Sequence, residues 1–179
     1  MEQIKIIFFA LASFFGMEDG RIAADKTTVT VYPENREVQI VQDKLFTIIQ
    51  SEKDSILVLQ QWDKLLNLEE RNTILAKELA RFSVKGFEIN STNNSIQPFL
   101  SLSYAKENDL RALGIWYNAD ENQFSINHTP SYNIKTKNGK LNGNYWYFCS
   151  DSAFSFTIEP FLQMPKNYQQ MKVPLREFL

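Results

Sequence analysis

Apolar and polar residues alternate with a period of two along much of this chain, as expected for β-strands. The clearest alternating runs are Thr28–Tyr32, Glu37–Val41, Leu100–Tyr104 and Phe124–His128. Shorter β-prone runs cover residues 45–49, 87–89 and 110–117, the last with Gly114 as a predicted bulge. The pattern therefore predicts a β-rich protein whose strands are joined by turns such as Pro33–Arg36.

The densest aromatic run is Asn144–Cys149, closely followed by Phe154–Ile158. It comes shortly after Asn138-Gly139, a strong signal for a two-residue hairpin turn. That hairpin would place Thr136 opposite Leu141, Ile134 opposite Gly143 and Tyr132 opposite Tyr145, with one apolar and one polar face. Beyond Tyr145 both faces are apolar, so we expect a central strand that is covered on both sides.

Between residues 51 and 82 the period of the apolar positions becomes helical. Ser51 is a candidate N-cap, and a strand over Ile56–Leu59 is the alternative for the start of this block. The first helix would group Val58, Leu59, Trp62, Leu65 and Leu66 on one side, with Gln60, Gln61 and Lys64 on the other. A second helix is predicted from Asn67 to a stop at Gly86, with the apolar stripe Leu68, Leu75, Leu79 and Phe82.

Together these elements predict an α+β fold with an antiparallel β-sheet and two amphipathic helices, near residues 52–82, packed on one face. A barrel-like closure of the sheet is an alternative form of the same prediction. Residues 25–179 are expected to form one domain, because no linker, repeat or low-complexity segment divides them. After Pro160, Pro165 and Pro174 favour irregular structure or edge pairing.

The chain begins with an apolar run over residues 6–17, which is too short to span a bilayer, since a spanning helix takes about 20 residues. Lys5 before this run and Ile22-Ala23-Ala24 after it make residues 1–24 a candidate signal peptide, and we expect a periplasmic or secreted protein. The charged residues Glu2, Glu18, Asp19 and Arg21 fit that pattern poorly. The alternative is an N-terminal hydrophobic helix in the core of a cytoplasmic protein.

Composition describes an ordered globular domain, with 44% hydrophobic and 22% charged residues. A net charge of −2, without any run of Lys or Arg, argues against a nucleic acid or an anionic membrane surface as partner. The aromatic content of 13% indicates a β-rich core or an aromatic ligand surface. One cysteine, Cys149, excludes an internal disulfide, and its apolar surroundings predict a buried, inert thiol.

A single histidine, His128, restricts the chemistry that this chain can perform. With only His128 and Cys149 as nitrogen and sulfur ligands, we expect no zinc site. The chain contains neither a Gly-x-Ser-x-Gly nucleophile motif nor a Gly-rich phosphate loop, so we assign no cofactor. Since His128 continues the alternation of Phe124 and Ile126, a structural role is favoured over that of a catalytic base.

These absences favour a non-catalytic binding or interaction protein with an aromatic-rich β-sheet, whose ligand is a small apolar molecule, a carbohydrate or a partner protein. The candidate binding residues are Trp116, Tyr117, Tyr145 and Trp146. The alternative is a small hydrolase that uses the loop carboxylates Asp109, Asp120 and Glu121 together with His128. It requires at least two of these groups to meet in one concave site.

Overall fold

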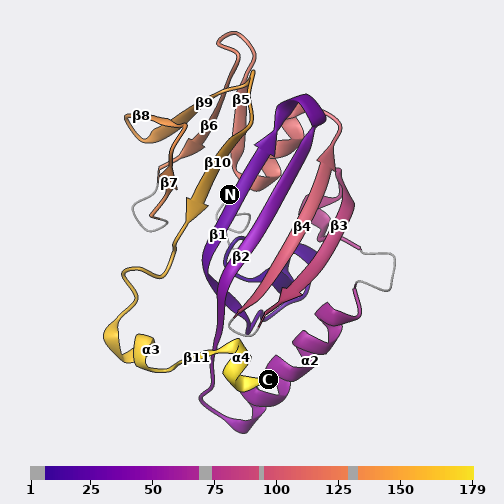
Figure 1. The fold of residues 1–179 in the computed structure, drawn as a ribbon, viewed down its shortest axis with the longest axis vertical. Coiled ribbons are helices and arrows are strands. Elements are labelled where there is room, and N and C mark those ends of the chain that lie inside the picture. Colours follow the sequence, from indigo (N-terminus) through magenta and orange to yellow (C-terminus); the bar gives the residue numbers. More distant parts are fainter. Residues whose placement is uncertain (1–6, 69–73, 93–94, 129–132) are drawn as a thin grey trace.

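A computed structural model describes residues 7–68, 74–92, 95–128 and 133–179 (Figure 1). Its strands are β1 (Ala23–Tyr32), β2 (Glu37–Ile48), β3 (Phe82–Ser91), β4 (Ile96–Tyr104), β5 (Ile115–Asn118), β6 (Gln123–Asn127), β7 (Lys135–Thr136), β8 (Lys140–Asn142), β9 (Tyr145–Cys149), β10 (Phe154–Ile158) and β11 (Lys172–Pro174). The α-helices are α2 (Glu52–Leu66), α3 (Lys166–Gln170) and α4 (Leu175–Phe178). Short 3-10 helices are η1 (Leu11–Phe15), η2 (Pro33–Asn35), η3 (Lys77–Leu79) and η4 (Glu107–Leu113).

The strands form two antiparallel sheets. The large sheet has the order β3-β4-β2-β1-β10-β7, with β11 paired to the end of β2, and the small sheet has the order β5-β6-β9-β8. The predicted α+β fold with antiparallel sheets is therefore confirmed. Both sheets remain open, so the barrel-like alternative is wrong.

One apolar row crosses five strands of the large sheet and forms the floor of the core. The ladder places Phe156, Val29, Ile40, Leu100 and Phe87 next to one another on β10, β1, β2, β4 and β3. All five side chains are buried. Since residues two apart on a strand face the same side, this row and its neighbours make one face of the large sheet apolar.

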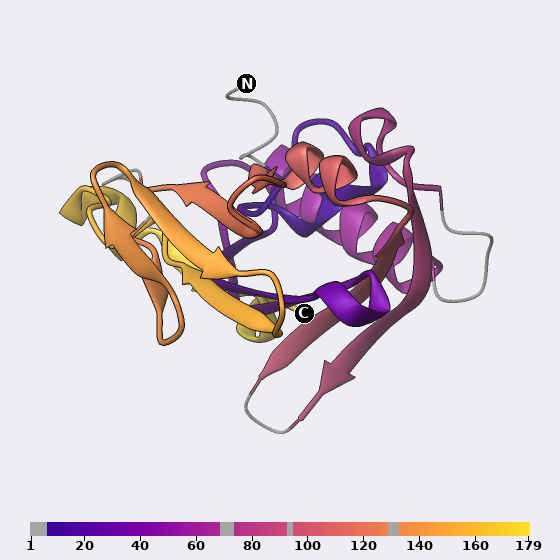
Figure 2. The same ribbon diagram turned by 90° about the horizontal axis from the view of Figure 1, so that it is seen from above.

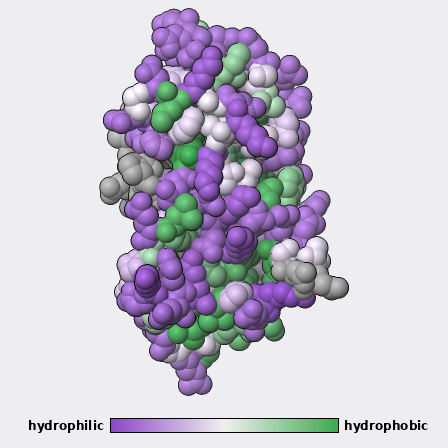
Figure 3. Space-filling model, turned by 60° about the vertical axis from the view of Figure 1, so that its left-hand side comes forward, coloured by the Kyte–Doolittle hydropathy of each residue, from purple (hydrophilic) through white to green (hydrophobic). Residues whose placement is uncertain are grey.

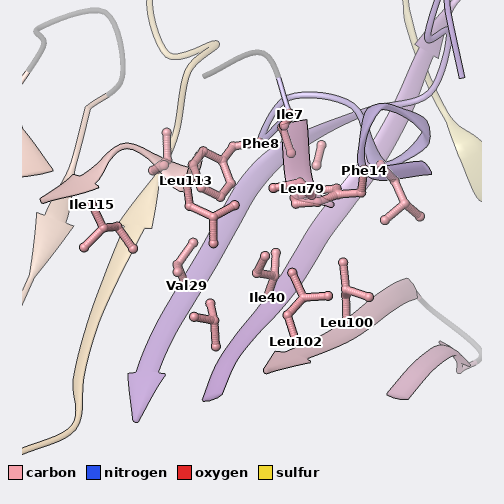
Figure 4. Close-up of a cluster of buried hydrophobic side chains, with 14 of the residues drawn as sticks. Ile7, Phe8, Phe14, Val29, Ile40, Leu79, Leu100, Leu102, Leu113 and Ile115 are labelled. Atoms are coloured by element: carbon pink, nitrogen blue, oxygen red, sulfur yellow. The ribbon is translucent and has the colours of Figure 1, made fainter. Parts of the chain in front are cut away.

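The N-terminal segment, η4 and α2 cover that apolar face. Figure 2 shows the large sheet curving around these elements, and Figure 4 shows Phe8 and Phe14 lying over the side chains of the sheet. Phe14 is completely buried, and its ring meets that of Phe8 edge to face at 6.1 Å. The apolar run near the N-terminus is therefore part of the core, as a 3-10 turn rather than a long helix.

Polar side chains inside the core hold the backbone of this segment. The hydroxyl of Thr27 donates to the carbonyl of Phe8 at 2.7 Å, and the amide of Gln42 donates to the same oxygen at 3.1 Å. The N–H of Ala24 donates to Phe9 O at 3.0 Å. A buried carbonyl outside regular structure must find such donors, which explains two polar residues on an otherwise apolar sheet face.

These contacts favour the core alternative for residues 7–17, because removal of residues 1–24 would leave Thr27 and Gln42 facing a void. Export of the protein stays a prediction. No helix in the described ranges is both long and apolar enough to cross a membrane.

Helix α2 begins at Ser51, which the sequence predicts as a candidate N-cap. Ser51 Oγ accepts from the N–H of Asp54 at 3.3 Å, and the Asp54 carboxylate accepts from the Ser51 hydroxyl and from the N–H of Gln50. Arg21 lies 3.1 Å from the other carboxylate oxygen. The Ser51 hydroxyl, then the Gln50 N–H and the Arg21 guanidinium, hold the pKa of Asp54 below its ordinary value of 3.8.

The buried face of α2 differs from the predicted one, because Gln61 points inward while Leu59 and Leu66 are exposed. Gln61 donates to the carbonyl of Asp19 at 2.9 Å and accepts from the N–H of Arg21 at 2.8 Å. The helix therefore turns its amide side chain toward the N-terminal segment, whose backbone needs partners.

The second predicted helix does not form in the described part of its range. Residues 74–76 have no regular structure, η3 covers only Lys77–Leu79, and β3 begins at Phe82. Gly86, the predicted stop, lies instead at a register shift in β3. The strand predicted over residues 110–117 is also shorter, because η4 continues to Leu113 and Gly114 ends it in the left-handed conformation.

The hairpin predicted at Asn138-Gly139 is wrong. Thr136 on β7 pairs with Phe156 in the large sheet, whereas Leu141 on β8 pairs with Trp146 in the small sheet. Residues 137–139 cross between the sheets, and the hairpin turn lies at Gly143-Asn144. A Cβ atom on residue 139 would come within 2.8 Å of the Phe148 ring. Glycine at this position therefore lets the backbone pass close to that ring. The predicted partner Tyr132 lies outside the described residues.

We predict that Phe14→Ala lowers the free energy of unfolding by about 3–5 kcal/mol, because it opens a cavity in the core. Denaturant unfolding measures this change. Leu162→Ala is the matched control: this side chain is 55% exposed, so its loss should cost less than about 0.5 kcal/mol. Equal small effects of both substitutions would contradict the placement of the N-terminal segment.

A second prediction concerns the cap of α2. The pKa of Asp54 is lowered by folding, so its carboxylate stabilises the protein above the ordinary pKa of 3.8, and this contribution is lost as the pH falls through the folded-state pKa. Asp54→Asn should therefore lower the unfolding midpoint at neutral pH, and the difference from wild type should shrink in acid. Asp63→Asn, on the exposed side of the same helix, should leave the midpoint unchanged at either pH. A deficit for Asp54→Asn that is constant down to strong acid would contradict this account.

Candidate functional site

A cluster of phenylalanine rings decides which face of the small sheet is buried. Phe148 on β9 stacks on Phe154 of β10 with ring centroids 4.4 Å apart, and Phe124 on β6 lies 5.3 Å from the same ring. All three rings are buried. Because β10 belongs to the large sheet, this cluster joins the two sheets and turns Phe124 and Phe148 inward.

The opposite, outer face of the small sheet therefore presents the alternate residues of β5, β6, β9 and β8. One row across the strands contains Trp116, Ser125, Tyr147 and Lys140. Tyr145 belongs to the next row, and its ring centroid is 6.4 Å from that of Tyr147. We call this surface, with Trp116, Tyr145 and Tyr147 at its centre, the aromatic face.

The rings of the aromatic face are accessible to solvent. Trp116 is 39% exposed and Tyr145 is 42% exposed, while Tyr147 is half-buried. Trp116 and Tyr147 are two strands apart, about 10 Å, with the small side chain of Ser125 between them. The face is thus a shallow platform on which rings stand at spaced positions.

Polar groups surround these rings. The outward positions of the four strands also carry amide side chains, namely Asn118, Gln123, Asn127 and Asn142. The guanidinium of Arg111 lies over the Trp116 ring at 5.2 Å from its centroid. None of these outward strand positions carries a carboxylate. Figure 3 turns the side with the small sheet toward the viewer; in its upper half hydrophilic residues dominate, with hydrophobic residues scattered between them.

The four predicted binding residues are divided between the two faces. Trp116 and Tyr145 lie on the aromatic face, whereas Tyr117 and Trp146 point toward the core, where both are half-buried. The expectation that both faces of the 145–149 strand are covered is therefore wrong, because the Tyr145 side is open. Tyr147, which was not among the predicted residues, also lies on the aromatic face, as strict alternation from Tyr145 along β9 requires.

Trp146 has a structural partner. Its indole N–H donates to Nδ1 of His128 at 3.1 Å, and the backbone N–H of His128 donates to Asn144 O. The two rings meet edge to face at 5.9 Å. This pairing fixes His128 at the end of β6. It also gives Nδ1 of the imidazole ring a hydrogen-bond donor within the protein.

Tyr117 lines a hollow of about 410 Å³ at the turn end of the small sheet, next to Asn122, Ser150 and Asp151. Its hydroxyl donates to Asn122 Oδ1 at 3.1 Å, and the Asn122 amide donates to Asp151 at 2.8 Å. The side chains of Tyr117, Asn122 and Asp151 are therefore hydrogen-bonded to one another within the hollow.

The groups of the hydrolase alternative do not converge. The buried carboxylate of Asp109 accepts from the N–H groups of Ala105 and Lys106 and therefore caps η4. Asp120 and Glu121 are exposed in the turn before β6, while His128 follows the other end of that strand, about 20 Å away along an extended chain. This arrangement offers no paired acid and base.

Cys149 is exposed, and the predicted buried thiol is wrong. It lies on the same side of β9 as Tyr145 and Tyr147, and its thiol donates to Asp151 Oδ2 at 3.7 Å. It also pairs with Gln123 at the end of β6 opposite His128, so no Cys–His pair forms. Among the described residues there is no group of three or more His, Cys, Asp or Glu side chains arranged to hold a metal ion.

Comparison of the chain with protein-family models, with curated proteins and with solved structures gave no match.

We predict that the Cys149 thiol reacts completely with Ellman's reagent in the native protein, because it is exposed. Absorbance at the released thiolate measures the reaction, and Cys149→Ser is the blank. A thiol that reacts only after denaturation would contradict the open outer side of β9.

Proposed function

We propose that the protein is a non-catalytic carbohydrate-binding protein and that the aromatic face is its binding surface. The observation that carries this proposal is the set of accessible rings, Trp116, Tyr145 and Tyr147, standing on one face of a sheet whose other face is held by the core. A sheet holds such rings at fixed spacing, so little conformational freedom is lost on binding.

The chemistry of the face suits a saccharide. A pyranose ring has a flat side of C–H groups, which stack on the electron-rich face of an aromatic ring, and a rim of hydroxyl groups. Amide side chains such as Gln123 and Asn127 both donate and accept hydrogen bonds, as hydroxyl groups do. A wholly apolar ligand would instead require an enclosed apolar pocket.

The charge of the aromatic face favours a saccharide over a nucleic acid as the ligand. A single-stranded nucleic acid also stacks on aromatic rings, but it requires a positively charged groove for its backbone. Beside the rings, the face offers only Lys140 and Arg111 as cations, and the chain carries a net charge of −2. A neutral polymer with hydroxyl groups therefore fits better than a polyanion.

The proposed protein is non-catalytic because the outward strand positions provide rings, amides and hydroxyls but no pair of carboxylates. With Asp109 engaged as a cap and His128 paired to Trp146, the protein binds its ligand without cleaving it.

The test is retention on insoluble cellulose, chitin, xylan and starch, followed by titration with oligosaccharides of the retained polymer. We predict that Trp116→Ala weakens binding about fivefold or more, since the loss of a stacked ring costs about 1 kcal/mol or more. Tyr145→Ala and Tyr147→Ala should weaken binding to a smaller degree, because these rings are smaller.

Tyr168→Ala is the matched control, because this tyrosine is 44% exposed but lies on α3. It should bind as the wild type does. Retention by none of the four polymers, or an equal loss in the Tyr168 variant, would overturn the proposal. Tighter binding of an oligothymidylate, with steep dependence on salt, would assign the face to nucleic acid instead.

A further inference from the structure

A second candidate site lies where β2 changes its partner. Residues Glu37–Val41 of β2 pair with β4, whereas Phe46–Ile48 pair with β11 from the C-terminal segment. Figure 1 shows β11 and α4 beside the lower end of β2. Between the two partners the sheet opens into a pocket of about 680 Å³, which is lined by both β2 and the C-terminal segment.

The floor of this pocket is apolar. It is formed by Leu45 and Phe46 of β2, Ile96 of β4 and Leu175 of α4, all of which are buried. Pro174, at the end of β11, adds a further apolar wall. A floor of this kind suits a hydrocarbon chain or ring.

The rim of the pocket carries more positive than negative charge. Four cations, Lys26, Lys44, Lys172 and Arg176, line it together with two carboxylates, Asp25 and Asp43. Asp25 forms an ion pair with Lys172, and Asp43 accepts a hydrogen bond from Gln97 and lies opposite Lys26 in the β1–β2 ladder. Like Lys26, the side chains of Lys44 and Arg176 form no ion pair among the described residues. Four cations against two carboxylates leave the rim with two surplus positive charges.

One of these two cations stands on an unusual backbone. Lys44 has φ +55°, in the left-handed region, in the middle of a 12-residue strand. The paired residues on either side are Ala24–Leu45 and Lys26–Asp43, so the distortion is local. A residue with a side chain pays a free-energy penalty in this conformation, and such distortions concentrate at ligand sites.

The other cation without a carboxylate partner, Arg176, belongs to the C-terminal segment. Arg176 donates to the carbonyl of Thr92, which ties α4 to the end of β3. The ammonium group of Lys172 lies over the Phe46 ring, 4.2 Å from its centroid, and holds β11 against β2. The C-terminal segment, which forms one wall of the pocket, is therefore held at Lys172 and at Arg176.

We propose that this pocket binds an amphipathic anion, with its carboxylate or phosphate head between Lys44 and Arg176 and its apolar part against Ile96 and Pro174. The proposal is independent of the carbohydrate-binding function, because the two sites share no residue. Carboxylate and phosphate heads have the same recognition chemistry here, since both accept charge-assisted hydrogen bonds from Lys and Arg.

The test is calorimetric titration of the full chain with dodecanoate, dodecyl phosphate, dodecanol and dodecyltrimethylammonium, each below its micelle concentration. We expect the anions to bind at least tenfold more tightly than dodecanol, and the cation not to bind. The ratio of the two anion affinities identifies the preferred head group. Hydrogen exchange of residues 172–178 should slow in the presence of the tighter anion.

Variants locate the head group. Lys44→Gln and Arg176→Gln should each weaken anion binding about five- to tenfold and leave dodecanol unaffected, whereas Lys53→Gln, an exposed lysine of α2, should change neither. Lys44→Gly separates function from folding: it should raise the thermal midpoint by about 2–4 °C, because glycine adopts positive φ freely, and yet weaken anion binding as Lys44→Gln does.

Three results would overturn the proposal. The first is equal affinity for dodecanoate and dodecanol, which would show that the cations take no part. The second is unchanged anion binding in both Lys44→Gln and Arg176→Gln. The third is the absence of binding heat and of protection at residues 172–178 with every probe.

Discussion

The stack of Phe148 on Phe154 is the contact on which the arrangement of the two sheets depends, with ring centroids 4.4 Å apart. Side chains alternate along a strand, so an inward Phe148 forces Tyr145 and Tyr147 of the same strand outward. Pairing with β6 and β5 carries this choice across the sheet and leaves Trp116 outside as well. The aromatic face is thus a consequence of core packing rather than an independent feature.

Much of the fold could be predicted from local pattern. The alternating runs became β1, β2, β4 and β6, and the Ser51 cap marked the start of α2. The errors arose where tertiary contacts decide. Gln61 is polar yet buried because the backbone of residues 19–21 needs its amide, and the turn at Asn138-Gly139 crosses between sheets because β7 pairs with β10. Neither partner is visible in a local window of sequence.

The candidate site was predictable in part, for the same reason. Aromatic density pointed to the strands of the small sheet, and two of the predicted residues, Trp116 and Tyr145, lie on the aromatic face, but composition alone could not say which rings face the core. The pocket at the end of β2 had no sequence signal, because it is formed by segments as distant as Lys26 and Arg176. The two surfaces also differ in kind: one is a rigid platform, and the other is closed on one side by the C-terminal segment.

Hydroxyl-radical footprinting, with and without the oligosaccharide that the protein binds best, reports on each ring of the aromatic face separately. We expect Trp116, Tyr145 and Tyr147 to be oxidised in the free protein and protected in the complex. Tyr168 should be oxidised equally in both states, and Phe148 in neither. Protection of Tyr168 with no change at Trp116, or rapid oxidation of Phe148 in the free protein, would contradict the assignment of the aromatic face.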